Sequence, residues 1–293
     1  MTKFYNQFKQ RFKSSNTIMR LIIINVVVFL VMNLLAIFLK LFNLDASAVS
    51  YYLSVPSDLQ ALLTRFWTPI SYMFYHKQFF HILFNMLMLF WFGQIFSLYH
   101  SDKQLLELYF FGGLMGALFY VAGYNIFPFY HSVSRISILM GASGSILALI
   151  VAAAMRAPNM EVRLLLLGRV KLMWIAFAMV LLSLFGLTSA NAGGELAHLG
   201  GAFAGYLFVS FDKKGKNITR FIGIVIDFFV NLFRPRPKKK TTKFHAQKLS
   251  PEEYNQKKAA DAREIDRILD KIKLSGYESL TAEEKRKLFE QKQ

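Results

Sequence analysis

The chain has 293 residues, of which 54% are hydrophobic and 16% are aromatic, and it contains 30 Phe and no Cys. This apolar content exceeds that of an ordinary soluble domain and predicts an all-α membrane protein with several spans. The absence of cysteine excludes disulfides, thiolate catalysis and Cys-based metal or iron–sulfur sites. The net charge of +17 is concentrated at the N-terminus, between certain spans and after Phe211, which favours a lipid bilayer rather than a nucleic acid as the partner of these cations.

Six apolar segments are predicted as membrane spans, at about 18–41, 79–98, 105–127, 136–155, 172–187 and 195–211. The first is long and lacks a small-residue cleavage pattern, so we expect it to be retained as a span. Basic residues precede it and recur at Lys103, between 156 and 171, and in the tail, which by the positive-inside rule places both termini in the cytoplasm. We therefore expect a multi-pass protein of the cell membrane, which in bacteria is the inner membrane.

The first outer loop, at about 43–78, is rich in Tyr, Phe and Trp. Aromatic side chains favour the membrane interface, so we expect a structured loop lying there. The alternative is a plain connecting loop with aromatic anchors.

The chain changes character after the sixth span. An apolar piece at 221–233 contains Asp227 and is short for a span, so it predicts an interfacial helix between basic anchors, with a seventh span as the alternative. Ser250 and Thr281 are each followed three residues later by Glu, the pattern of a capping box, which predicts a pair of soluble helices. One helical face is marked by Ile265, Ile268, Leu269 and Ile272. The predicted organisation is a cytoplasmic tail at 1–17, a six-span domain at 18–212, a basic linker with the interfacial helix at 213–249, and a soluble helical tail at 250–293.

Three polar signatures lie near the starts of apolar segments, at His81 with Asn85, at Ser143 and at His198. Polar groups at membrane depth are costly unless paired and predict a functional site. With the N-terminus inside, the second, fourth and sixth spans all run inward from the outer face. Ser143 then lies about 10 Å and His198 about 5 Å below the start of its span, so the two can meet. A serine hydroxyl beside a neutral imidazole is the minimum for nucleophilic catalysis.

Glycines surround both of these residues. Gly141 and Gly144 flank Ser143, while Gly201 and Gly205 follow His198, and such small faces let helices approach closely in lipid. Helix packing alone is the alternative reading of the glycines. A soluble hydrolase elbow is excluded because position 145 is Ser and no strand is predicted before the motif.

His81 and Asn85 are four residues apart and share a helix face, where both could donate to a developing oxyanion beside the Ser143 amide. The alternative is that they form interhelical hydrogen bonds. A metal site is a weaker alternative that would use His76, His81, His131 and His198, and we expect neither a metal nor a cofactor. Glu195 is the one acid near His198; we expect it to act on the helix dipole, which leaves a Ser–His pair without an acid.

These motifs resemble those of the rhomboid family of intramembrane serine proteases. They are Gly-x-Ser-Gly at 141–144, His-xxx-Asn at 81–85 and Ala-His-xx-Gly at 197–201, and their order, spacing and topology agree with the family across about 65–212. The resemblance implies a six-transmembrane-helix rhomboid-like bundle, here with a basic helical cytoplasmic extension. It also implies Ser143 as nucleophile, His198 as base and acid, and an oxyanion site formed by His81, Asn85 and the Ser143 amide.

The resemblance further implies that substrates pass between the second and fifth spans, beneath the loop at 189–194. Two positions depart from the family. The first outer loop has Trp67-Thr68, preceded by Arg65, where many members have Trp-Arg, and Leu147 replaces an aromatic residue that often supports the catalytic histidine.

We predict a serine endopeptidase that hydrolyses peptide bonds in or near the transmembrane segments of single-span proteins. The alternative is an inactive rhomboid-like adaptor that binds transmembrane clients, although an adaptor has no need of an intact Ser143 and His198. A transporter lacks support because no broken pair of spans carries charges at mid-depth. The oligomeric state stays open.

Overall fold

The computed structural model describes residues 16–134, 136–164, 168–232 and 250–290. The chain divides into two compact units, 1–234 and 235–293, and each is described by itself.

The first unit is a bundle of helices that correspond to the six predicted segments. They are α2 (Thr17–Leu41), α6 (Phe79–Ser97), α7 (Asp102–Ile126), α8 (Ser143–Arg156), α9 (Leu172–Phe185) and α10 (Ala192–Asp212). Within the described residues, α2, α6 and α7 are long and apolar enough to cross a membrane, whereas α8 and α9 are shorter apolar helices. The structure therefore supports a helical membrane protein, and the count of six spans stays a prediction.

The start of α8 differs from the sequence prediction. The predicted segment began at 136, but the helix begins at Ser143, and β2 (Ile138–Leu139) pairs antiparallel with β1 (Val55–Pro56) of the first outer loop. Strand pairing uses the backbone groups of this stretch, and Gly141 has a φ of +111°, which a helix cannot accommodate. Ser143 is consequently the first residue of its helix and does not lie 10 Å along it.

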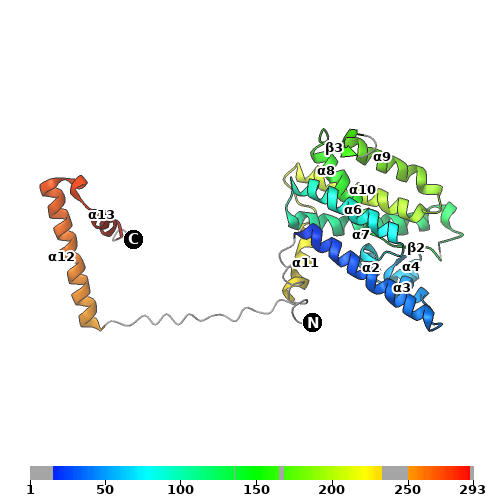
Figure 1. The fold of residues 1–293 in the computed structure, drawn as a ribbon, viewed down its shortest axis with the longest axis horizontal. Coiled ribbons are helices and arrows are strands. Elements are labelled where there is room, and N and C mark those ends of the chain that lie inside the picture. Colours follow the sequence, from blue (N-terminus) through cyan, green and yellow to red (C-terminus); the bar gives the residue numbers. More distant parts are fainter. Residues whose placement is uncertain (1–15, 135, 165–167, 233–249, 291–293) are drawn as a thin grey trace. The chain divides into compact units, whose positions relative to one another are not determined.

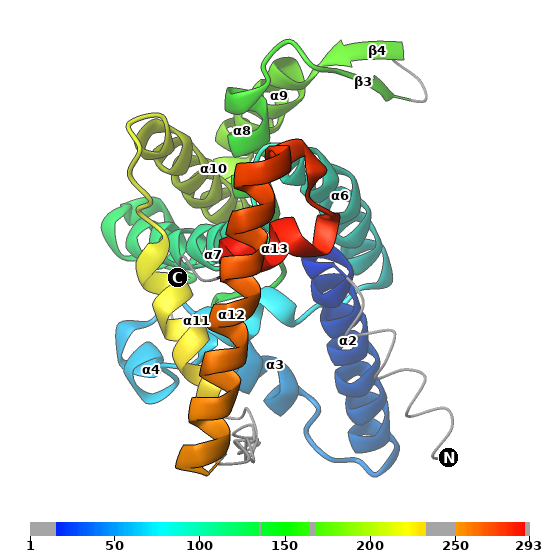
Figure 2. The same ribbon diagram turned by 90° about the vertical axis from the view of Figure 1, so that its left-hand side faces the viewer.

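The centre of the bundle is formed by α7, α8 and α10, which pack against one another (Figures 1 and 2). Glycines allow this closeness. A Cβ built on Gly201 would collide with the Gly144 carbonyl, and one on Gly205 would collide with the Ala148 carbonyl. The close approach of α8 and α10 brings the starts of these two helices together.

The first outer loop is structured, as predicted. It contains α3 (Ser47–Leu53), α4 (Leu59–Thr64), α5 (Thr68–Ser71) and the 3₁₀ turn η1 (Tyr72–Phe74), and a second 3₁₀ turn, η2 (Pro128–Tyr130), follows α7. Buried Tyr72 donates its hydroxyl to the Gly113 carbonyl of α7 at 2.6 Å, which ties the loop to the bundle.

Two further elements lie at the ends of the bundle helices. The hairpin of β3 (Glu161–Leu164) and β4 (Gly168–Lys171) projects from the ends of α8 and α9 (Figure 2). Helix α11 (Arg220–Leu232) packs on the start of α7, where Lys103 pairs with Asp227 at 2.6 Å. Helix formation at 220–232 agrees with the prediction, and residues 233–249 lie outside the described residues.

The second unit contains α12 (Pro251–Ser275), a 3₁₀ turn η4 (Tyr277–Ser279) and α13 (Ala282–Glu290). Both predicted capping boxes are confirmed. Ser250 and Glu253 exchange hydrogen bonds at the start of α12, and Thr281 and Glu284 do the same at the start of α13. Of the predicted apolar face, Ile268 is buried.

Candidate active site

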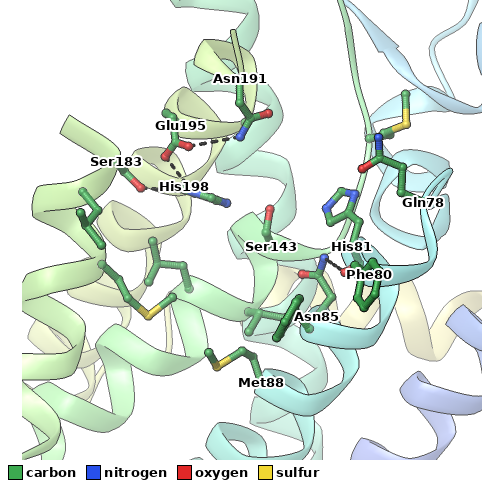
Figure 3. Close-up of a pocket in the computed structure, with 17 residues that line it drawn as sticks. Gln78, Phe80, His81, Asn85, Met88, Ser143, Ser183, Asn191, Glu195 and His198 are labelled. Atoms are coloured by element: carbon green, nitrogen blue, oxygen red, sulfur yellow. Dashed lines mark hydrogen bonds and ion pairs between the residues drawn. The ribbon is translucent and has the colours of Figure 1, made fainter. Parts of the chain in front are cut away.

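A cavity of about 490 Å³ opens between α6, α8, α9 and α10 and is lined by both halves of the predicted dyad. Ser143 comes from α8 and His198 from α10, while His81 and Asn85 line the opposite wall from α6 (Figure 3). The structure thus brings together all four of the polar residues that the sequence singled out.

Ser143 occupies the first position of α8. The first N–H groups of a helix have no partner within it, so the Ser143 amide is free of the helix ladder. The preceding turn is shaped by Gly141, whose N–H donates to the Tyr72 carbonyl at 2.9 Å. A Cβ on Gly141 would lie 2.8 Å from Nε2 of His81, so glycine also permits the close approach of that ring.

His198 is held through one ring nitrogen. Its Nδ1 lies 3.1 Å from Ser183 Oγ and 3.1 Å from Glu195 Oε2. The other side of the ring is directed toward Ser143 (Figure 3). Within the described residues no hydrogen bond joins Ser143 Oγ to the ring, a common state of catalytic pairs before substrate binds.

Glu195 lies in the first turn of α10, as the helix-dipole expectation requires, and it also contacts the His198 ring, which that expectation did not include. Its Oε2 contacts the imidazole, and its Oε1 accepts from Asn191 Nδ2 at 3.1 Å. Glu195 and His198 are three residues apart, and their i, i+3 spacing on α10 places them on one face, so the carboxylate reaches the ring. The serine and histidine are therefore accompanied by an acid.

The α6 wall supplies hydrogen-bond donors. Asn85 Nδ2 donates to the His81 carbonyl at 2.8 Å, and because an amide nitrogen carries two hydrogens, the second stays available to a ligand. With the Ser143 amide and the His81 ring, this makes three groups able to donate to an oxygen bound in the cavity.

The sequence interpretation missed the role of two supporting residues. Buried His76 accepts the Ala142 N–H at its Nε2, at 3.3 Å, and so supports the turn before Ser143. Ser183 reaches His198 from α9. The sequence could have indicated this role, because Ser183 is a polar residue in a leucine-rich run, and a polar residue in an apolar helix often makes a functional contact.

Leu147, which stands where an aromatic residue often supports the histidine, is buried and lines the same cavity. An aliphatic side chain therefore packs at this position in place of an aromatic ring. Across the described part of the chain, no three His, Cys, Asp or Glu side chains gather as a metal-binding group.

The site and bundle define a class of protein, an α-helical membrane protein with a serine, a histidine and hydrogen-bond donors around one cavity. Residues 63–214 match the family model of the Rhomboid domain, and since this is more than half of the chain, the protein belongs to the rhomboid family. Residues 251–291 match a family of unknown function, DUF6576, which coincides with the α12–α13 unit. No curated protein matches the sequence.

Proposed function

We propose that this protein is an intramembrane serine endopeptidase that hydrolyses peptide bonds in or near transmembrane segments of other membrane proteins. The observation that carries the proposal is the shared cavity of Ser143 and His198, in which the ring is anchored at Nδ1 and its other side faces the serine. Membership of the rhomboid family, most of whose members are such proteases, supports it.

The reaction follows from the placement of these groups. His198 Nε2 takes the proton of Ser143 Oγ as that oxygen bonds to the substrate carbonyl carbon, and the carbonyl oxygen becomes an oxyanion. Asn85, His81 and the Ser143 amide stabilise that charge. The C–N bond then breaks, and the imidazolium gives its proton to the leaving amine. Water attacks the acyl ester in a second round, which returns Ser143 to its free hydroxyl.

The expected substrates are single-span membrane proteins. A peptide bond inside a helix has its carbonyl hydrogen bonded within the segment, so cleavage requires local unwinding, and small helix-weakening residues near the outer face favour it. Substrates would reach the cavity between α6 and α9, two of the helices that line it. We place the protein in the cell membrane, with both termini in the cytoplasm and α11 at the cytoplasmic interface.

The alternative is an inactive family member that binds transmembrane clients, because such members exist within the family. An adaptor needs the groove but not the serine, the histidine or their supports. The retention of Ser143, His198 and the α6 donors around one cavity favours the protease.

The test uses the purified full-length protein in liposomes with a model single-span substrate. We expect cleavage by the wild type and by Ser145→Ala, and none by Ser143→Ala or His198→Ala. Ser145 is the matched control because it is a buried serine on the same helix that does not line the cavity. The same products from wild type and Ser143→Ala would refute the proposal.

A further inference from the structure

We infer that Glu195 is a positioning residue for His198, one that orients and supports the imidazole of the Ser143–His198 pair. This inference deepens the proposed function and rests on it.

The contact itself is well placed for this role. Glu195 Oε2 lies 3.1 Å from His198 Nδ1, and their side chains retain 18% and 24% of their exposure. Partial removal from water strengthens an interaction between a carboxylate and an imidazole relative to a surface pair. The carboxylate is therefore close enough to His198, and sufficiently shielded from water, to orient the imidazole and stabilise its charge.

The carboxylate is fixed at its other oxygen as well. Asn191 Nδ2 donates to Oε1 at 3.1 Å, and the Asn191 backbone N–H is held by Ser189 Oγ at 3.1 Å. Gly186, at the end of α9, leaves the room that the side chain needs, since a Cβ there would lie 2.7 Å from Cγ of Glu195. Asn191, in the connection between α9 and α10, thus fixes the carboxylate, and Gly186 leaves it room beside the ring.

The chemistry of the contact sets the proton on the ring. An ionised carboxylate only accepts hydrogen bonds, so Glu195 favours the tautomer with its hydrogen on Nδ1. Nε2 then keeps the lone pair that a base needs toward Ser143. When Nε2 takes the serine proton, Glu195 stays ionised and stabilises the imidazolium until the proton passes to the leaving amine.

No other acid lines the cavity among the described residues. The groups that face His198 are His81 from α6, Ser143 from α8 and Ser183 from α9, and none of these carries a negative charge. Ser183 offers a second oxygen near Nδ1 but is neutral, so it orients the ring without stabilising its charge. The electrostatic part of the role falls to Glu195.

The experiment compares Glu195→Gln, Glu195→Asp and Ser183→Ala with wild type in full-length protein, following cleavage of the single-span substrate from pH 5 to 9. We expect Glu195→Gln to lower kcat about a hundredfold with KM within about threefold, because the amide can donate to Nδ1 and favour the wrong tautomer. Glu195→Asp should retain more of the rate because it keeps the carboxylate, and Ser183→Ala should lower kcat less than Glu195→Gln because Ser183 is neutral.

Glu161→Gln is the matched control, since this exposed acid lies on β3, and it should behave as wild type. Should Glu195→Gln lose its folded state, Asn191→Ala provides the second variant: it keeps the charge, releases Oε1, and should lower kcat several-fold. The positioning role is overturned if folded Glu195→Gln, or Asn191→Ala in its place, cleaves at the wild-type rate across the pH range while Ser143→Ala is inactive. An inactive wild type whose Ser143 resists a fluorophosphonate would instead overturn the proposed function, and with it the positioning role that rests on it.

Discussion

Arg65 holds the first outer loop through one buried side chain. Its Nη1 donates to the Tyr51 carbonyl at 2.6 Å, its Nε donates to the Ala61 carbonyl at 3.3 Å, and its guanidinium lies 3.8 Å from the centre of the Tyr51 ring. Trp67 Nε1 donates to the Tyr52 carbonyl at 2.9 Å nearby. This chain lacks the Trp-Arg pair of many family members, but Arg65, two positions before Trp67, anchors the loop through its own contacts.

We expect Arg65→Lys to destabilise the protein by about 1–2 kcal/mol. Lysine is a point charge without the planar fork, so it loses the stacking on Tyr51 and one of the two hydrogen bonds. The melting temperature in detergent measures this and should fall by a few degrees. Arg169→Lys, at an exposed position in β4, should leave it unchanged, and equal melting of both variants would show that Arg65 does not anchor the loop.

The proposed oxyanion role of Asn85 can be distinguished from a purely structural role by comparison with Asn125. Its backbone-directed hydrogen bond to the carbonyl four residues earlier has a counterpart in Asn125, which donates to the Val121 carbonyl at 2.8 Å outside the cavity. We expect Asn85→Ala to lower kcat roughly a hundredfold with little change in KM, because its donor acts on charge that forms in the transition state. In the same assay Asn125→Ala should keep most of its kcat, and a similar loss in both variants would contradict the oxyanion role.

At the scale of elements, the contact between α8 and α10 determines where the serine and histidine lie. Gly201 faces the Gly144 carbonyl with no room for a methyl group, and a Cβ on Gly144 would lie 3.0 Å from the Ala197 carbonyl oxygen. Backbone cannot move aside as a flexible side chain can. A methyl group at this contact must therefore separate the two helices.

Gly201→Ala should cost about 1–3 kcal/mol of stability through overpacking and should greatly reduce cleavage, because it moves His198 away from Ser143. Thermal unfolding in detergent and the cleavage assay measure the two effects. Gly93→Ala is the matched control, since the three atoms nearest to its added Cβ all belong to the Ile18 side chain, the first at 3.1 Å, and this side chain can adjust. Wild-type activity in Gly201→Ala would show that the close approach is not required.

The start of α13 depends on an ionised carboxylate. The Thr281 N–H and the Lys271 ammonium hold the pKa of Glu284 well below its ordinary value of 4.5, at about 2. A lowered pKa in the folded state stabilises the fold above pH 4.5, and this contribution is lost as the pH falls toward 2.

We therefore expect hydrogen-exchange protection of α13 in the full-length protein, corrected for intrinsic rates, to fall between pH 5 and pH 2.5. Glu284→Gln should show weak protection at both values, because the amide removes the charge on which the cap and the Lys271 pair depend. Glu283→Gln, beside it, should follow wild type, since it keeps the hydrogen bonds between Thr281 and Glu284. Protection in wild type that does not change with pH would argue against the ionised cap.

Several features of the fold and site could be predicted from local sequence. Ser143, His198, His81 and Asn85 are polar groups at the starts of apolar helices, a pattern with few explanations other than a site. The capping box at Ser250 likewise depends on residues only three apart.

The features that could not be predicted depend on distant contacts. The apolar stretch at 136–142 reads as part of a helix, and only its pairing with Val55–Pro56 shows that it is not. The role of Glu195 depends on Asn191, and on α9 ending at a glycine beside it. Spacing on one helix allows the contact with His198 but does not distinguish it from a carboxylate that faces solvent.

At the scale of the whole molecule, every residue lining the candidate active site lies between Gln78 and His198, within the first unit. The α12–α13 unit has its own buried residues, Ile268 and Leu280, and its own capping hydrogen bonds. The bundle likewise holds α11 by itself, since Thr219 Oγ1 donates to the buried carboxylate of Glu107 at 2.9 Å just before that helix begins. The residues of the candidate active site and the capping and buried residues of the α12–α13 unit therefore belong to different units.

A chain that ends at Leu232 should accordingly fold and cleave the model substrate with kcat/KM within about threefold of the full-length protein, since every residue that lines the cavity belongs to the first unit. Cleavage in liposomes measures this, with Ser143→Ala in the shortened chain as the inactive control. A loss of more than tenfold in a shortened protein that melts at the wild-type temperature would mean that the residues after Leu232 act on the cavity. In that case the tail would have to be treated as part of the enzyme.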